Sequence, residues 1–230
     1  MNVGHIDTDQ LKGKQFVASY SGGKDSIFAI YKAMQAGLMP VGLLTTYNTD
    51  ANRSWFHGVT ESLLQNVSTS LAIPLTLIKT SGEDYAANFE KTLVLARGQG
   101  AEVCVFGDID IEGHLEWCTQ RCEKAGLMPY FPLWNGNRKD LVYEFIDAGF
   151  KSIITVVDTS RLPKEFLGKT LSREILEAIE RSGADICGEN GEYHTFAFDG
   201  PILTRKVDFI VVGIVERDNY GILSLDVPGA

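Results

Sequence analysis

The sequence has no long apolar run, few cysteines and fewer basic than acidic side chains. The absence of 18 consecutive apolar residues excludes a typical membrane-spanning helix. The first seven residues lack the apolar core of a signal peptide, so we expect no secretion signal. Only four cysteines occur among the 230 residues, at positions 104, 118, 122 and 187. Because they do not form a disulfide framework, we predict reduced thiols in a cytoplasmic protein.

Basic residues are outnumbered, with 21 Lys and Arg against 30 Asp and Glu, which gives a net charge of −9. Extended nucleic-acid binding needs a basic surface that neutralises phosphates, so the composition weighs against a nucleic-acid partner. A local basic groove remains compatible with this charge. The hydrophobic content of 44% is enough for a buried core and excludes wholesale disorder. The length suits one large domain or two small ones.

The first half of the chain alternates strand-like and helix-like segments. This alternation predicts a doubly wound α/β domain with a parallel sheet covered by helices on both faces. Ligands in such sheets bind beyond the carboxyl ends of the strands. We expect those ends to carry residues 21–26, Thr45 and Thr46, and Gly107 with Asp108. The expected strands are 15–20, 41–46, 74–78 and 103–107, and the expected helices follow residue 26 and span 59–71, 84–98 and 115–126.

The second half has a different pattern, which predicts a second, smaller α+β domain. Two apolar runs, 207–212 and 220–225, indicate a strand pair joined near Asp218 and Asn219. We place the boundary near residue 130, so that the domains cover residues 1–130 and 131–230. The other expected elements are helices at 138–149 and 171–182 and a strand at 152–157.

The most informative segment is the sequence Ser-Gly-Gly-Lys-Asp-Ser at residues 21–26. It lies between an apolar strand and an amphipathic helix. The first turn of a helix has backbone N–H groups without helical partners and a favourable dipole, so this geometry binds phosphate. Gly22 and Gly23 allow close approach of the anion, Lys24 adds charge, and Asp25 is the candidate Mg²⁺ ligand. Ser21 and Ser26 add hydroxyl donors. The plain alternative is an ordinary Gly-Gly turn.

Two better-known phosphate loops do not fit this segment. A Walker loop requires glycine and Ser or Thr where this chain has Ala18 and Asp25. No Gly-x-Gly-x-x-Gly dinucleotide motif occurs near the turn. The segment instead resembles the pyrophosphate-binding loop of the PP-loop ATP pyrophosphatases, a doubly wound α/β superfamily that cleaves ATP to AMP and pyrophosphate.

A second unusual segment, Gly188-Glu-Asn-Gly-Glu-Tyr-His-Thr195, precedes a β-like run. It combines two carboxylates, Glu189 and Glu192, with the His194 imidazole and a hydroxyl. Such groups can coordinate a metal, bind an amine or transfer protons. The alternative is a solvated acidic loop in which His194 has an ordinary structural role.

Taken together, the loop at 21–26 and the segment at 188–195 resemble the diphthine–ammonia ligase family. Segments around Phe106–Ile109, Phe131–Trp134 and Leu167-Gly168 also fit, so the resemblance covers almost the whole chain. The late segment is also similar to that of bacterial relatives. In this family the first domain binds ATP and the second forms the substrate pocket. The resemblance implies a ligase that adenylates a carboxylate and transfers ammonia to it.

The resemblance also implies roles for individual residues. Lys24 and Asp25 would act on the phosphates of ATP, and Glu189, Glu192 or His194 would orient ammonium and accept its proton. The remaining expected ATP contacts are Ser21, Gly22, Gly23, Ser26, Thr45, Thr46, Gly107 and Asp108. The remaining expected substrate contacts are Gly188, Asn190, Gly191 and Thr195. Expected ligands are ATP, Mg²⁺, ammonium and a carboxylate acceptor, either a protein-bound diphthine-like group or a small molecule.

Two other functions stay open. One is a different PP-loop adenylating enzyme, such as a tRNA-modifying enzyme, and the other is a non-catalytic nucleotide-binding protein. The oligomeric state, monomer or homodimer, is also open.

The sequence is compatible with more than one role for two further sets of residues. His114, Cys118 and Cys122 share one helix face, but eight residues rise about 12 Å, too far for one ion to bind all three on a straight helix. Buried cysteines are the preferred interpretation. The segment Trp55–His57 either contacts nucleotide as a lid or anchors the core.

Overall fold

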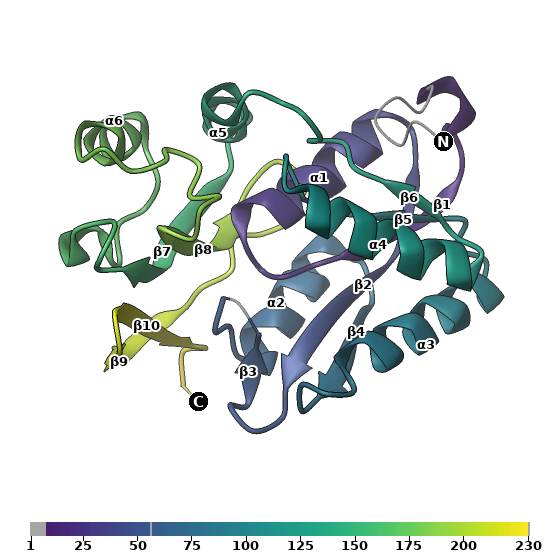
Figure 1. Cartoon of the computed structure of the whole chain (residues 1–230), viewed down its shortest axis with the longest axis horizontal. Helices are drawn as coiled ribbons and strands as arrows, with labels where there is room; N and C mark the ends of the chain where they lie inside the picture. The colour runs from purple at the N-terminus through teal and green to yellow at the C-terminus, as the bar shows by residue number, and fades with distance from the viewer. Residues whose placement is uncertain (1–7, 56, 230) are drawn as a thin grey trace. The chain divides into compact units, whose positions relative to one another are not determined.

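The computed structural model describes residues 8–55 and 57–229 of the chain (Figure 1). The chain divides into two compact units, which we describe separately. Unit 1 comprises residues 1–21, 25–52 and 73–136, and unit 2 comprises residues 22–24, 53–72 and 137–230. Phe56, part of the predicted lid segment, lies outside the described residues. Of the described helices, none has the length and apolar character needed to cross a membrane.

A parallel sheet with the strand order β4-β2-β1-β5-β6 forms the centre of unit 1. This arrangement confirms the predicted α/β class with a parallel sheet. The elements of the unit are η1 (Thr8–Gln10), β1 (Gln15–Ser19), α1 (Lys24–Gln35), β2 (Met39–Asn48), β4 (Leu75–Thr80), α3 (Tyr85–Gly98), β5 (Val103–Val105), α4 (Glu112–Ala125) and β6 (Met128–Tyr130).

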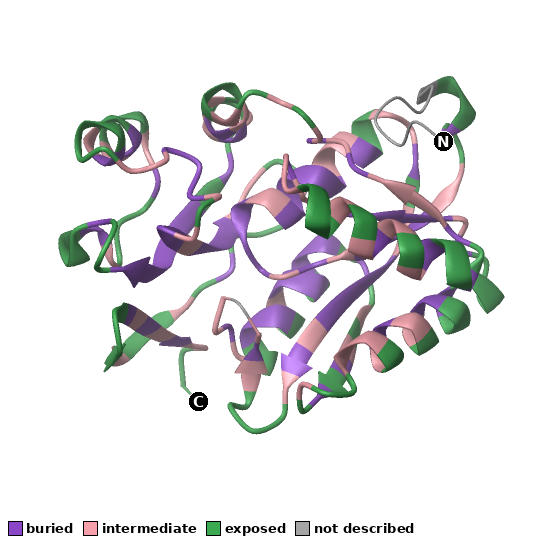
Figure 2. Ribbon diagram, viewed as in Figure 1, coloured by how far each residue is buried: buried purple, intermediate pink, exposed green. Residues whose placement is uncertain are grey.

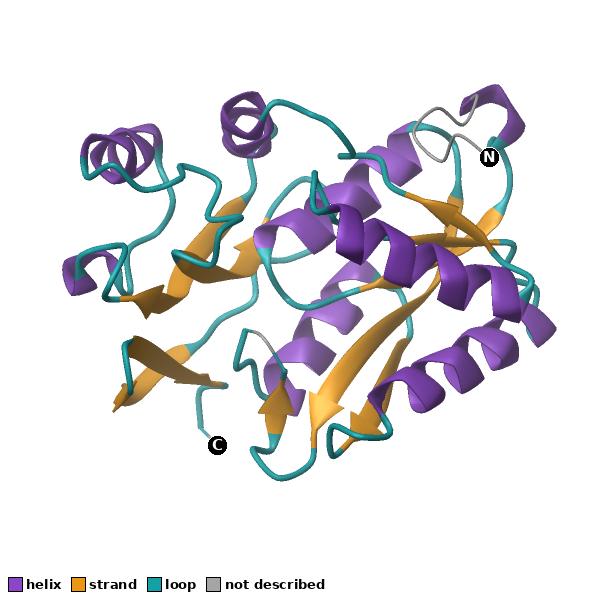
Figure 3. Cartoon of the chain, in the orientation of Figure 1, coloured by secondary structure: helices purple, strands orange, loops and turns teal. Residues whose placement is uncertain are grey.

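Helices α3 and α4 pack on each other beside this sheet (Figures 1 and 3). The Trp117 ring lies 5.3 Å from the Phe89 ring and 5.8 Å from the Tyr85 ring, measured between centroids. Their buried side chains join strand residues in one hydrophobic core, and their outward faces are exposed (Figure 2). This core is what holds the carboxyl ends of the strands in place.

The cysteines of unit 1 belong to this core. Cys104, Cys118 and Cys122 are buried there as thiols, and Cys187 in unit 2 is also a buried thiol that forms no disulfide. Burial raises the pKa of the Cys118 thiol far above its usual value. The Nδ1 atom of His114 lies 3.0 Å from Asp108 Oδ1. The burial of Cys118 and Cys122 confirms the prediction that they are core cysteines.

The predicted bounds of one strand in unit 1 are wrong, and another strand was not predicted. Strand β2 continues to Asn48 because it also pairs with β4, which places Thr46 opposite Ile78 and Asn48 opposite Thr80. Thr45 and Thr46 therefore lie within the strand and not at its end. The sequence also gave no indication of β6, a three-residue edge strand with Pro129 at its centre. Proline cannot donate to a ladder, so it is tolerated at such an edge.

Unit 2 contains an antiparallel sheet with the strand order β8-β7-β10-β9. The predicted strand pair is confirmed as the β9–β10 hairpin, in which Arg217 pairs with Tyr220 and Asp218 has a φ of 54°. The elements are β3 (Arg53–Ser54), α2 (Glu61–Leu71), α5 (Arg138–Asp147), β7 (Lys151–Asp158), η2 (Lys164–Phe166), α6 (Arg173–Arg181), β8 (Tyr193–Asp199), β9 (Ile210–Arg217) and β10 (Tyr220–Asp226). The predicted domain boundary near residue 130 stays a prediction.

Candidate functional site

The middle of the glycine-rich loop, residues 22–24, lies along strand β8 within unit 2. The carbonyl of Gly22 accepts a hydrogen bond of 2.9 Å from the N–H of Ala197. The N–H of Lys24 donates to the Thr195 hydroxyl at 3.0 Å. Gly22 has a φ of 93°, a conformation that favours glycine. The two segments singled out in the sequence are therefore joined by hydrogen bonds.

The Lys24 ammonium is almost completely buried, with 4% of the residue exposed. Its Nζ atom lies 3.9 Å from Glu189 Oε1 and 5.7 Å from the centre of the Tyr193 ring. Both neighbours favour the charged form of the lysine, one as a carboxylate and the other through the negative face of its ring. A buried cation in a glycine-rich turn is suited to an anionic ligand.

Two carboxylates, Asp185 and Glu192, accept hydrogen bonds from the backbone of residues 185–195, which we call the late loop. Glu192, 5% exposed, accepts hydrogen bonds from the Asp185 N–H at 3.3 Å, the Asn190 N–H at 3.1 Å and the Asn190 side-chain amide at 3.1 Å. Asp185 accepts from the N–H groups of Cys187 at 2.9 Å and Glu189 at 3.2 Å. Both oxygens of Glu192 are thus used within the loop, which is a structural arrangement. Its predicted catalytic role stays a prediction.

Glycines allow the backbone of this loop to turn sharply. Gly188 has a φ of 77° and Gly191 a φ of 87°. A Cβ on Gly188 would lie 2.9 Å from a ring carbon of Tyr193, whereas a Cβ on Gly191 would meet nothing within 4 Å. Only Gly188 is thus required for space as well as for conformation.

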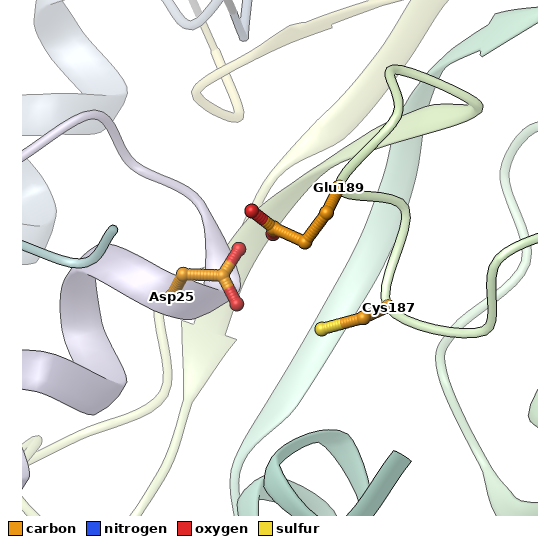
Figure 4. A group of neighbouring side chains, drawn as sticks. All are labelled: Asp25, Cys187 and Glu189. Atoms are coloured by element: carbon orange, nitrogen blue, oxygen red, sulfur yellow. The ribbon is translucent and has the colours of Figure 1, made fainter. Parts of the chain in front are cut away.

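The side chains of Cys187 and Glu189 extend from the same side of this loop (Figure 4). Their candidate metal-ligating atoms lie within 4.8 Å of each other. The Glu189 carboxylate faces the Lys24 ammonium. Within the loop, Glu192 accepts internal hydrogen bonds, Glu189 has a charge interaction with Lys24, and Asp185 combines internal hydrogen bonds with an ion pair to Arg138 at 2.5 Å.

Two histidines lie beside the loop in unit 2. The ring centroids of His57 and His194 are 5.0 Å apart in an edge-to-face arrangement. Burial lowers the pKa of His57 to about 3, and the nearby His194 and Lys24 act in the same direction. Burial and the Lys24 charge lower the pKa of His194 to about 4. Both imidazoles are therefore neutral at pH 7 and can accept protons or hydrogen bonds.

The ends of the glycine-rich loop belong to unit 1. The Ser21 hydroxyl donates to the Ser26 hydroxyl at 3.2 Å, which closes the loop across its base. Asp25 lies in the first turn of α1 and is drawn in Figure 4. A Cβ on Gly107 would lie 2.7 Å from the backbone carbon of Asp25. Gly107 is therefore a close-contact glycine, and its contact in this structure is the start of α1.

Three other predicted ATP contacts have hydrogen-bond partners in unit 1. The buried Thr45 hydroxyl donates to the Tyr20 carbonyl at 2.5 Å, and the Thr46 hydroxyl accepts from the Tyr85 hydroxyl at 3.2 Å. Asp108 contacts His114 as described above. Their predicted roles toward nucleotide stay predictions.

Sequence reasoning left out Asp185 and gave His57 no defined role. A carboxylate two residues before Cys187 is a recognisable turn-forming position, because Asp side chains bond the backbone two residues on. No local pattern links His57 to residues 194 and 195, since 138 residues separate His57 from Thr195.

Unit 1 has a parallel sheet and unit 2 has an antiparallel sheet, and a glycine-rich turn joins the first strand to the first α-helix. These features define a two-part α/β protein. The model of the diphthamide synthase N-terminal domain matches residues 14–129, and that of the diphthamide synthase C-terminal domain matches residues 137–226. The chain therefore belongs to the diphthamide synthase family, as the resemblance to diphthine–ammonia ligases predicted.

Individual relatives agree with this assignment. Proteins named diphthine–ammonia ligase from Bos taurus and Homo sapiens are each 25% identical over 215 residues, which covers 83% of this chain and 80% of each relative. The protein of that name from Danio rerio is 26% identical over 217 residues, with 83% of this chain and 84% of the relative covered. A predicted tRNA methyltransferase subunit from Methanocaldococcus jannaschii has a TM-score of 0.43 at 13% identity, over 84% of this chain and all of that one. Nothing in the assignment depends on this structural likeness.

Proposed function

We propose that this protein is an ATP-dependent ligase that joins ammonia to a carboxylate by way of an acyl-adenylate. The observation that carries the proposal is the hydrogen bond between the Lys24 N–H and Thr195, with the Lys24 ammonium beside Glu189. It brings the glycine-rich loop and the late loop together within one unit. The name of the relatives, diphthine–ammonia ligase, supports ligation with ammonia as a substrate.

The chemistry requires activation of the carboxylate. Hydroxide is a poor leaving group, so a carboxylate and ammonia do not condense at neutral pH. Attack of a carboxylate oxygen on the α-phosphorus of ATP forms the acyl-adenylate and releases pyrophosphate. Ammonia then attacks the acyl carbon, the bond to the AMP oxygen breaks, and one proton leaves the nitrogen. The products are an amide, AMP and pyrophosphate.

The glycine-rich loop would hold the departing pyrophosphate. The buried Lys24 ammonium supplies positive charge in a place shielded from water, where it is worth more than at the surface. Ser21 and Ser26 contribute hydroxyls at the base of the loop. Asp25 is the residue we propose for Mg²⁺, because a carboxylate in the first turn of the helix that follows such a loop is an oxygen donor of the type this ion prefers.

The late loop would handle the nucleophile. Glu189 is the acid best placed to orient ammonium, because the oxygens of Glu192 are used inside the loop. His194 is neutral at pH 7, so its imidazole can accept the proton that ammonia loses. The centroid of its ring lies 5.0 Å from that of the His57 ring. Glu192 then serves the reaction by holding the loop in shape.

The test is to measure AMP and pyrophosphate with ATP, Mg²⁺, ammonium and candidate carboxylates. Formation of both products that depends on ammonium and on a carboxylate, and that Asp25→Ala abolishes with the fold intact, supports the proposal. ADP as the product contradicts it. Adenylation that is independent of ammonium favours a different adenylating enzyme. Nucleotide binding without turnover favours a sensor.

We also propose the type of acceptor, the cellular location and an oligomeric state. The acceptor is a carboxylate, either on a protein-bound diphthine-like group or on a small molecule. The protein acts in the cytoplasm. A homodimer is a form to be tested by measuring the mass in solution.

A further inference from the structure

His57 has contacts that link it to both segments of the proposed site. It follows β3 in a turn that is closed by two hydrogen bonds. The Ser54 N–H donates to the Val59 carbonyl at 2.9 Å, and the Val59 N–H donates to the Ser54 hydroxyl at 3.0 Å. Ser54 and Val59 are both buried. Two hydrogen bonds thus join a residue before His57, Ser54, to a residue after it, Val59.

The His57 ring occupies the space beside Gly23. A Cβ on Gly23 would lie 2.3 Å from Cε1 of the ring and 2.8 Å from Nδ1, distances that real Cβ atoms do not adopt. Gly23 is not among the glycines with a positive φ, so its backbone conformation does not require glycine. The His57 ring is therefore the physical reason for glycine at position 23.

The same ring donates a hydrogen bond to β8. His57 Nδ1 lies 2.8 Å from the Thr195 carbonyl oxygen. A carbonyl only accepts, so Nδ1 carries the proton and Nε2 is the acceptor nitrogen of a neutral ring. The Thr195 hydroxyl in turn accepts from the Lys24 N–H at 3.0 Å. Thr195 is thus held by His57 through its carbonyl and holds the loop through its hydroxyl.

We propose that His57 is a positioning residue that sets the conformation of Gly22–Lys24 for binding the phosphates of a nucleotide. It acts in two ways, by packing against Gly23 and by orienting Thr195 toward the Lys24 backbone. This inference rests on the proposed function, in which the same loop binds the pyrophosphate part of ATP. It assigns to His57 a role that neither its sequence position nor its neighbours in the chain indicate.

The experiment is to measure binding of magnesium pyrophosphate, Mg–ATP and adenosine by calorimetry to the full chain. His57→Ala should weaken pyrophosphate and ATP binding by about tenfold, the equivalent of one hydrogen bond. Adenosine binding should not change, because adenosine has no group for the loop. His57→Asn places an amide N–H near the Nδ1 position and should recover part of the loss, whereas His57→Gln places it near Nε2 and should not.

A stability-matched control is Thr60→Ala, which removes the side-chain cap of α2 three residues from His57 and leaves the ring in place. It should leave pyrophosphate binding unchanged. If Thr60→Ala weakens pyrophosphate binding as much as His57→Ala does, or if His57→Ala weakens adenosine binding equally, the effect is general loosening and the inference is wrong.

A double-variant cycle tests the packing contact. Gly23→Ala alone should weaken pyrophosphate binding strongly because its Cβ meets the His57 ring. In the His57→Ala background the same change should cost several-fold less. Equal costs in both backgrounds would overturn the packing argument. If the unaltered protein binds neither pyrophosphate nor ATP, the proposed function fails, whereas intact binding by every His57 variant refutes only the role of His57.

Discussion

The glycine-rich loop at 21–26 and the late loop at 185–195 are both polar, glycine-containing turns, but they are built differently. The first is defined by the strand before it and the helix after it. The second follows α6 and leads into β8, and two of its own acids, Asp185 and Glu192, accept hydrogen bonds from its backbone. The comparison shows that acidic residues of one loop can have different roles, and that the role of each depends on its burial and its interaction partners. The following experiments test these roles.

The largest effect is expected at Lys24. Lys24→Ala removes the buried cation that would face the leaving pyrophosphate and should lower kcat by about 10²–10³-fold. Lys24→Arg keeps the charge but changes its shape and should recover only part of the activity. The measurement is AMP release under saturating ATP. A Lys24→Ala variant with full activity would remove Lys24 from the proposed mechanism.

The second effect separates the two glutamates in stability. Glu192→Ala leaves the N–H groups of Asp185 and Asn190 without their buried acceptor and should lower the free energy of unfolding by about 2–4 kcal/mol. Glu189→Gln should lower it by less, because the amide keeps an oxygen acceptor beside the buried Lys24 ammonium, whose Nζ atom lies 3.9 Å from the Glu189 carboxylate. Urea unfolding curves of both variants decide the matter. Equal losses of unfolding free energy would show that Glu192 has no greater structural role than Glu189.

For activity we expect the opposite order, with a larger loss on substitution of Glu189 than of Glu192. Glu189→Gln keeps the size of the side chain but removes its charge, and should lower kcat/KM by about 10²-fold. The check is steady-state kinetics with ammonium as the varied substrate. An unchanged kcat/KM for ammonium would assign the handling of the amine to another residue.

The third effect is a dependence of stability on pH. The pKa of His57 is about 3 in the folded protein and near 6.5 when unfolded. The unfolded chain therefore binds more protons between these values, and stability falls as the pH is lowered from 6.5 toward 3. The slope for His57 is about 1.4 kcal/mol per pH unit. Unfolding free energies measured at pH 7, 6 and 5 should fall less steeply for His57→Asn. Parallel curves for the two proteins would contradict the neutral buried imidazole.

The smallest effect concerns the two glycines of the late loop. Gly191→Ala adds only the strain of a positive φ, about 1 kcal/mol, because its Cβ has open space. Gly188→Ala adds the same strain and a contact with the Tyr193 ring, and should cost about 1–3 kcal/mol more. Thermal unfolding of both variants gives the difference. Equal costs would show that Tyr193 moves aside without penalty.

Much of the fold could be predicted because its elements have local signatures. The β9–β10 hairpin was recognisable from two apolar runs separated by Asp218 and Asn219. Strand β6 was not, because three residues around Pro129 become a strand only by pairing with β5. Thr45 and Thr46 were placed at a strand end for a similar reason, since the length of β2 depends on its second partner, β4.

Some features of the candidate site, like some of the fold, could be predicted from the sequence, and others could not. The sequence by itself determined the two polar loops, because each is a short run of neighbouring residues, and the family, because its motifs can be recognised one by one along the chain. Only the tertiary structure decided that Glu192 is used inside its own loop, that the His57 ring requires Gly23, and that Thr195 links both. Those decisions come from packing and hydrogen bonds between segments as many as 171 residues apart, as between Lys24 and Thr195, and no local pattern encodes such pairings.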